Sequence, residues 1–275
     1  QLLKDGEGYT AIMLTLYGSI AAIMALMIFG FPIIYLKNFL ISIYPFIKLL
    51  IPGFLILISL TLISREHYKY KALFIFLLTG TLGFFILRFE NLNQPLLPLL
   101  TGLFGASNLI LSIKNKTRIP YQKIEKPKIE SIKPFFGSLL ASPLCCFFPA
   151  LGSGQAALIG NIITKTNNKG FLILIGMTNT LVMIFSFIFL FILGTTRTGS
   201  AVAIKELINI SNKEIVLILI SIIIAGFIAF FLAQLISKTI IKRITKINYT
   251  KVSIITLIIL IIITTSVSGI LGLVV

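Results

Sequence analysis

Acidic residues, histidine and cysteine are all scarce in this sequence. Its 275 residues include eight Asp and Glu, one His and two Cys. The one histidine, His67, has no pair of carboxylates nearby, which argues against a catalytic triad or a histidine metal site. Cys145 and Cys146 are adjacent and lack the spacing of a zinc site, so we interpret them as small packing residues. No cofactor is expected.

Charged residues are also few, at 12%, whereas a soluble domain has about 25%. Hydrophobic residues make up 57%, and the mean hydropathy is +1.06. No globular fold hides this much apolar surface from water, so the lipid bilayer must be the solvent. The net charge of +16 comes from basic residues in short loops. That pattern is typical of cytoplasmic loops in a multi-pass protein of the cell membrane, and nothing indicates a nucleic-acid partner.

Long apolar runs predict the fold, because a spanning helix needs about 20 apolar residues. Pro45, Lys48 and Pro52 break the run 39–63, so we predict a short lead-in followed by a span from about Leu49. Alternation with a period of two is absent, which argues against strands. We predict an all-α polytopic membrane protein with about seven transmembrane helices and one re-entrant, broken helical hairpin, as one part of an inverted-repeat transporter. The predicted spans are 11–36, 49–63, 72–87, 96–113, 171–193, 215–236 and 252–275.

Loop charges identify residues 135–163 as the hairpin. If every apolar run crosses once, the loops on the two faces carry +7 and +8, which gives no orientation. If 135–163 enters and leaves on one face, the totals become +13 and +2. The second arrangement follows the positive-inside rule and places 114–133 and 238–251 in the cytoplasm.

The residues of this segment agree with a hairpin. Two apolar arms of about 13 residues flank the core 149–154, and each arm is too short to span a bilayer. Pro149 ends a helix, and irregular backbone at membrane depth is tolerated only where it is buried or lines a wet cavity.

A helix that begins after this break would present free backbone N–H groups to the membrane interior. Those groups and the helix dipole favour a carboxylate or a phosphate. A Pro/Gly kink that serves packing alone explains the same residues equally well, and both interpretations stay open. The predicted binding residues are Pro149, Gly152, Ser153, Gly154 and Gln155.

Three further polar residues are candidates for the substrate path. Asn179 and Thr180 lie in an otherwise apolar run, where an amide needs a partner or a wet cavity. Hydrogen bonds between helices are the alternative role for them. Arg197 is expected on the outer face, where it would meet an incoming anion or remain a solvated loop arginine.

Four stretches in this order resemble the TctA family, the large membrane subunit of tripartite tricarboxylate transporters, and especially its archaeal-type branch. They are Leu97-Pro98-Leu99-Leu100-Thr101-Gly102-Leu103-Phe104-Gly105, Phe148-Pro149-Ala150-Leu151-Gly152-Ser153-Gly154-Gln155-Ala156-Ala157, Thr178-Asn179-Thr180 and Arg197-Thr198-Gly199-Ser200-Ala201-Val202-Ala203. The resemblance covers the later part of a family member, so we expect further sequence upstream. Ala150 and Gly154 depart from the family's Pro-Gly-x-Gly-Pro form.

The resemblance implies ion-coupled uptake of carboxylates, with Na⁺ or H⁺ as the coupling ion. It also implies a small membrane subunit and an extracytoplasmic binding protein as partners; a homo-oligomer is left open. We therefore expect residues 1–275 to form a single permease domain for a small organic anion. A translocase for polyprenyl-phosphate or another anionic lipid carrier is the alternative. An enzyme is disfavoured, because the apolar runs contain no Asp, Glu or His.

Overall fold

The computed structural model describes residues 2–88, 94–115, 119–129, 131–148, 151–196, 198–244 and 248–274. Within these ranges the regular structure is helical and no strand occurs, which confirms the predicted all-α class. Contacts divide the chain into two compact units. The first comprises residues 1–56 and 122–242, and the second comprises 57–121 and 243–275.

Seven helical segments are long and apolar enough to cross a membrane, as the apolar runs predicted. Most of them expose their apolar side chains, as lipid-facing helices do, whereas the span Asn168–Leu193 is 56% buried against its neighbours. The spans are Gly8–Tyr35 (α1 Gly8–Ala25, η1 Leu26–Gly30 and α2 Phe31–Tyr35), α3 Lys37–Arg65, α4 Lys69–Leu87, Leu96–Lys114 (α5 Leu96–Leu100, η2 Thr101–Ala106 and α6 Ser107–Lys114), α9 Asn168–Leu193, α11 Asn212–Ile244 and α12 Tyr249–Ser268. The shorter helices are α7 Lys133–Phe147, α8 Ser153–Thr164, α10 Gly199–Leu207 and α13 Leu271–Val274.

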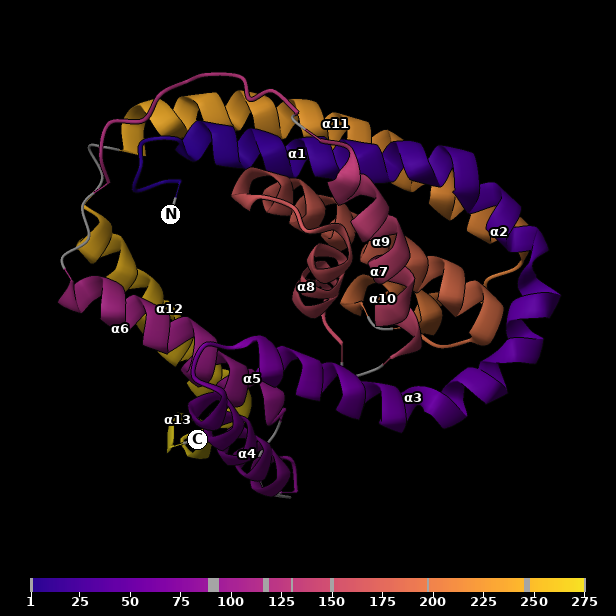
Figure 1. Cartoon of the computed structure of the whole chain (residues 1–275), viewed down its shortest axis with the longest axis horizontal. Helices are drawn as coiled ribbons and strands as arrows, with labels where there is room; N and C mark the ends of the chain where they lie inside the picture. The colour runs from indigo at the N-terminus through magenta and orange to yellow at the C-terminus, as the bar shows by residue number, and fades with distance from the viewer. Residues whose placement is uncertain are drawn as a thin grey trace. The chain divides into compact units, whose positions relative to one another are not determined.

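The prediction of a lead-in before Leu49 was wrong. Helix α3 is continuous over 29 residues and contains both Pro45 and Pro52. Each proline removes one backbone donor and bends the helix without ending it, and Figure 1 shows α3 as a curved helix. Pro52 lacks the N–H that would otherwise bond to the carbonyl of Lys48, four residues earlier.

In the first unit, α1 and α9 lie side by side and run in the same direction. Glu7, before α1, pairs with Lys169 at the start of α9 at 3.2 Å. Further along, the hydroxyl of Ser19 donates to the carbonyl of Gly176 at 3.3 Å. A Cβ atom on Gly176 would collide with the backbone of Thr15, so only glycine permits this approach. Close backbone contact of this kind is the usual way in which membrane helices pack.

Helices α7 and α8 form an antiparallel hairpin that packs against α9. The two arms touch through Gly137 and Gly160, and the two ends of the hairpin, at Lys133 and Lys165, line one cavity. The hydroxyl of Ser138 donates to the carbonyl of Leu174 in α9 at 3.1 Å. A short apolar core joins α1, α9 and α11 through residues that include Leu26, Leu181, Ile184, Ile188, Ile215 and Leu219.

In the second unit, α12 packs on the span that contains α6. The hydroxyls of Ser253 and Ser112 are 3.4 Å apart, and a side-chain methyl of Leu260 lies against Gly105 of η2. These contacts hold the span Leu96–Lys114 against α12. None of the predicted site residues belongs to this unit.

Candidate functional site

The α7–α8 hairpin turns between Phe147 and Ser153, and we call this turn the tip. Helix α7 ends at Phe147 and helix α8 begins at Ser153, with Gly152 in an extended conformation before it. Pro149, one of the predicted site residues, lies outside the described residues, as does Ala150. The chain therefore leaves helix α7 after Phe147 and enters helix α8 at Ser153, so the described residues Phe148, Leu151 and Gly152 are not helical, which agrees with the predicted break near 149–154.

A hydrogen bond joins Gly152 and Gln155, two of the predicted binding residues. The Oε1 atom of Gln155 accepts from the backbone N–H of Gly152 at 3.0 Å, which is one half of a capping box. The thiol of Cys145 donates to the carbonyl of Gly152 at 3.1 Å. The Gly152 N–H is therefore occupied, whereas the sequence interpretation expected it to be free. Gln155 orders the start of α8, and its side-chain NH₂ group keeps its donors.

The beginning of α8 borders open space. Gly154 is exposed, and a Cβ atom placed on it would meet nothing within 4 Å. Ser153 is half-buried beside it. The first N–H groups of a helix have no acceptor earlier in their own helix, so the start of α8 carries free donors at Ser153 and Gly154 and the positive end of the helix dipole.

The tip lies alongside the second half of α9. The thiol of Cys146, one residue before the end of α7, is 3.9 Å from the carbonyl of Val182. Val182 is 14 residues after Asn168, and Phe189, whose ring centre is 4.6 Å from that of Phe147, is 21 residues after it, so these contacts lie about 21–32 Å along a helix of about 39 Å. The hairpin therefore reaches past the middle of this neighbouring membrane span.

The other predicted site residues do not gather at the tip. The hydroxyl of Thr180 donates to the carbonyl of Gly176 in its own helix at 3.1 Å. Asn179 is exposed on α9 and lines none of the described cavities. Arg197 lies outside the described residues. The described residues thus bring together Gly152, Ser153, Gly154 and Gln155, without Asn179.

A cavity of about 240 Å³ lies next to the tip, and we call it the tip cavity. Helices α3, α7 and α9 and the loop after α9 form its walls. Its polar groups are hydroxyls, one thiol and one ammonium. The lining residues are Tyr44, Lys48, Ile51, Cys146, Phe147, Ser186, Phe189, Thr195 and Thr196.

Sequence reasoning missed Lys48 as a site residue and treated it as a break in an apolar run. Within the described ranges it is the one charged side chain more than ten residues from both ends of its membrane span. A charged residue at this depth is costly in lipid and usually marks a functional site. The apolar run 39–63 contains no other charge, and this was the signal that could have identified it.

Two aromatic contacts of α3 show where Lys48 lies relative to α9 and the tip. The ammonium of Lys37, at the start of α3, lies 4.1 Å from the ring centre of Phe191, near the end of α9. The rings of Phe54 and Phe148 stack at 4.5 Å, which joins α3 to the tip. Along α3, Lys48 therefore lies between Lys37, which contacts the end of α9, and Phe54, which contacts the tip.

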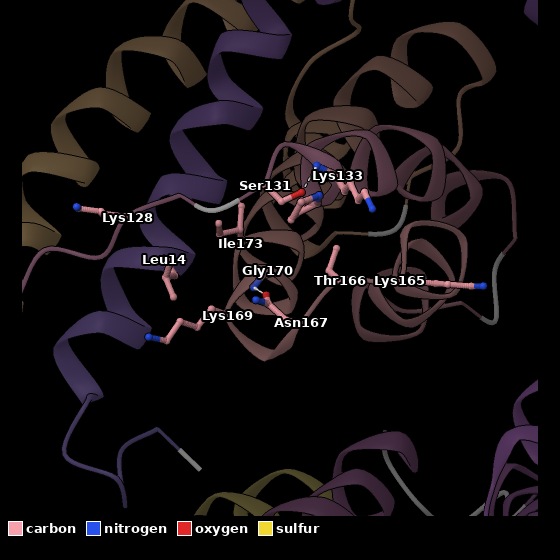
Figure 2. A pocket seen from close by; sticks show the side chains of 11 residues that line it. Leu14, Lys128, Ser131, Lys133, Lys165, Thr166, Asn167, Lys169, Gly170 and Ile173 are labelled. Atoms are coloured by element: carbon pink, nitrogen blue, oxygen red, sulfur yellow. Dashed lines mark hydrogen bonds between the residues drawn. The ribbon is translucent and has the colours of Figure 1, made fainter.

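A second cavity, of about 290 Å³, lies at the opposite end of the hairpin, and we call it the basal cavity. Figure 2 shows Lys128, Lys165 and Lys169 pointing outward around Asn167 and Gly170, with no convergence on one point. Lys169 is already paired with Glu7. This basic end is the one that the loop charges assign to the cytoplasm. The remaining lining residues are Leu14, Ser131, Lys133, Pro134, Thr166 and Ile173.

Comparison with known proteins connects this geometry to a family. The family model for the tripartite tricarboxylate transporter TctA family matches residues 1–275. This chain belongs to the TctA family. The predicted resemblance is thereby confirmed, and the seven spans are those of a multi-pass membrane protein of a transporter family.

A relative of this TctA chain is the uncharacterized protein MJ1079 of Methanocaldococcus jannaschii. The two are 28% identical over 254 residues, which is 90% of this chain and 63% of the relative. The chain therefore spans less than two thirds of the length of that protein. No solved structure matches the chain.

Proposed function

We propose that this TctA chain forms part of an ion-coupled permease for small organic anions of the di- or tricarboxylate class. The observation that carries the proposal is the start of α8, which begins at Ser153 next to the exposed Gly154, where a Cβ atom would meet nothing within 4 Å. Transporters commonly bind anionic groups at the N-termini of broken helices near the bilayer midplane. Membership of a tricarboxylate transporter family supports the same class of substrate.

The course of α1 and α9 supports the re-entrant arrangement on which this proposal depends. If segment 135–163 crossed the membrane once, α9 would run in the direction opposite to α1. The contacts from Glu7 to Lys169 and from Ser19 to Gly176 show the same direction. With a re-entrant α7–α8 hairpin the two spans both run outward from the cytoplasm, which agrees with the loop charges.

The proposals for the coupling ion, the partner proteins and the membrane location rest on family membership alone. We propose Na⁺ or H⁺ coupling, a small membrane subunit, an extracytoplasmic binding protein and a location in the cell membrane. The described apolar spans contain no Asp, Glu or His away from their ends, so a carboxylate relay for protons has no residues here. The lipid-carrier alternative gains no support from the family match.

Transport by the natural-length protein in proteoliposomes tests the proposal. We expect an imposed ion gradient to drive uptake of radiolabelled citrate or succinate above the level in protein-free liposomes. Gly154→Leu fills the space beside the N–H groups and is expected to abolish uptake, while Gly53→Leu, where a Cβ also meets nothing, is the matched control. Absence of carboxylate uptake under every gradient, or full uptake by Gly154→Leu, would contradict the proposal.

A further inference from the structure

We propose that the ammonium of Lys48 binds a carboxylate of the transported anion in the tip cavity, as a second positive element beside the start of α8. The inference rests on the proposed function and deepens it by naming a residue that contacts the substrate. Lys48 is one of the residues that line the tip cavity, which belongs entirely to the first unit.

The charge of Lys48 has no counter-charge in the described structure. It takes part in no ion pair or hydrogen bond there, in contrast to Lys169, which pairs with Glu7, and Lys205, which donates to the carbonyl of Gly194 at 2.8 Å. Residues on α7 and α9 that face it are uncharged. Lys48 is exposed, and an anion in the cavity that it lines would supply the counter-charge that its ammonium lacks in a membrane span.

The other polar groups of the tip cavity suit an anion. Ser186, Thr195 and Thr196 carry hydroxyls, and the hydroxyl of Thr196 donates to the carbonyl of Ser186 at 3.2 Å. No carboxylate lines the cavity to compete with a bound anion. A volume of about 240 Å³ corresponds to about eight waters of liquid, which is enough for a small solute.

The position of Lys48 relative to the tip accounts for a preference for several carboxylates. Lys48 lies six residues, about 9 Å of helix, before Phe54, whose ring stacks on Phe148 at the tip. The tip cavity also contains Cys146 and Phe147 at the end of α7. In this proposal one carboxylate meets the ammonium of Lys48 in the tip cavity, and another reaches the first N–H groups of α8, which follow the same tip in sequence.

Lys48→Gln tests this role in the natural-length protein reconstituted in proteoliposomes. We expect the KM for citrate to rise about 10- to 100-fold, the scale of a charge-assisted hydrogen bond, and to rise less for a monocarboxylate that is also transported. Lys48→Arg keeps the positive charge and is expected to stay within a few-fold of the wild type. Lys37→Gln is the matched control, because it removes a lysine from the same helix outside the tip cavity.

The outcomes separate this inference from the proposed function. If the wild type takes up citrate and Lys48→Gln has the same KM for citrate as the wild type, the role of Lys48 is overturned, whereas the proposed permease function stands. If the wild type takes up inorganic phosphate but no carboxylate, carboxylates are not the substrate class. The KM of the same variants for phosphate would then test whether Lys48 binds the transported anion. Equal losses in Lys48→Gln and Lys48→Arg, with unfolding temperatures unchanged, would also contradict a role that depends on charge.

Discussion

Two glycines set the distance between α1 and α9. A Cβ atom on Gly18 would overlap the backbone of Ile173, and one on Gly176 would overlap the backbone of Thr15. Backbone atoms cannot rotate away as a flexible side chain can, so either substitution must separate the helices. The hydrogen bond from Ser19 to Gly176 depends on the same close approach.

Gly176→Ala is therefore expected to destabilise the protein. Overpacking of this kind costs about 1–3 kcal/mol. Thermal unfolding in detergent should show a lower midpoint for Gly176→Ala and Gly18→Ala. Gly53→Ala, in open space on α3, should unfold at or above the wild-type temperature, because alanine favours a helix over glycine. A midpoint for Gly176→Ala equal to that of Gly53→Ala would mean that α1 and α9 do not meet this closely.

Gln155 offers a prediction that separates capping from substrate binding. Gln155→Glu keeps an acceptor for the Gly152 N–H and should retain the unfolding temperature, but its negative charge should raise the KM for an anion. Gln155→Leu removes the acceptor and should destabilise the protein by about 1 kcal/mol. Uptake and unfolding are measured on the same preparations. An unchanged KM in Gln155→Glu would place the anion away from the start of α8.

At the residue scale, the sequence predicted where the break occurs but not how its groups pair. Pro149 and the glycines indicated the break, since proline lacks a donor and glycine tolerates irregular backbone. The bond from Gln155 to Gly152 depends on the rotamer of one side chain, which composition does not specify. Lys48 was overlooked because loop charges were counted and the single charge inside a span was not.

At the scale of elements, the α7–α8 hairpin brings two loops of the chain to one end. Lys128, Ser131 and Thr166 line the basal cavity although 38 residues separate the first from the last. Because both arms are shorter than a bilayer is thick, the hairpin has to return to the face that it entered. We therefore predict that the loop before α7 and the loop after α8 lie on the same face of the membrane.

Single cysteines introduced at Lys128, Thr166 and Asn209 test the hairpin, with Cys145 and Cys146 replaced by alanine. We expect Lys128→Cys and Thr166→Cys to react with a membrane-impermeant maleimide from the cytoplasmic face. Asn209→Cys, in the loop after α10, should react from outside. Labelling of the first two from opposite faces would show that α7 and α8 together cross the membrane. The unsubstituted double-alanine protein controls for background labelling.

The elements themselves were largely predictable, because a run of about 20 apolar residues has few alternatives in lipid. The prediction failed at α3, where prolines were interpreted as the end of a helix. Neighbouring groups and lipid surroundings allow a membrane helix to continue through proline with a bend. Helix α10 was not predicted, since Gly199–Leu207 is too short and too polar to be distinguished from a loop.

At the scale of the whole molecule, seven crossings by the seven described candidate spans would put the two ends of this chain on opposite faces. Seven crossings and a re-entrant hairpin leave Val275 outside if the start is cytoplasmic. Alkaline phosphatase fused after Val275 should be active, and green fluorescent protein at the same point should be dark. Fusion after Arg243, in the basic segment 238–251, should give the reverse pattern. Fluorescence from the fusion after Val275 would require an even number of crossings.

The contact between α1 and α9 also constrains how the protein is made. Ser19 and Gly176 are 157 residues apart in sequence. At about 5–20 residues per second, a ribosome needs roughly 8–30 s to produce the second helix after the first. During that interval the glycine face of α1 has no partner in the bilayer, although α3, α4 and the next span are already being inserted. The packing of α1 on α9 is therefore completed only after α3, α4 and the span Leu96–Lys114 have been synthesised.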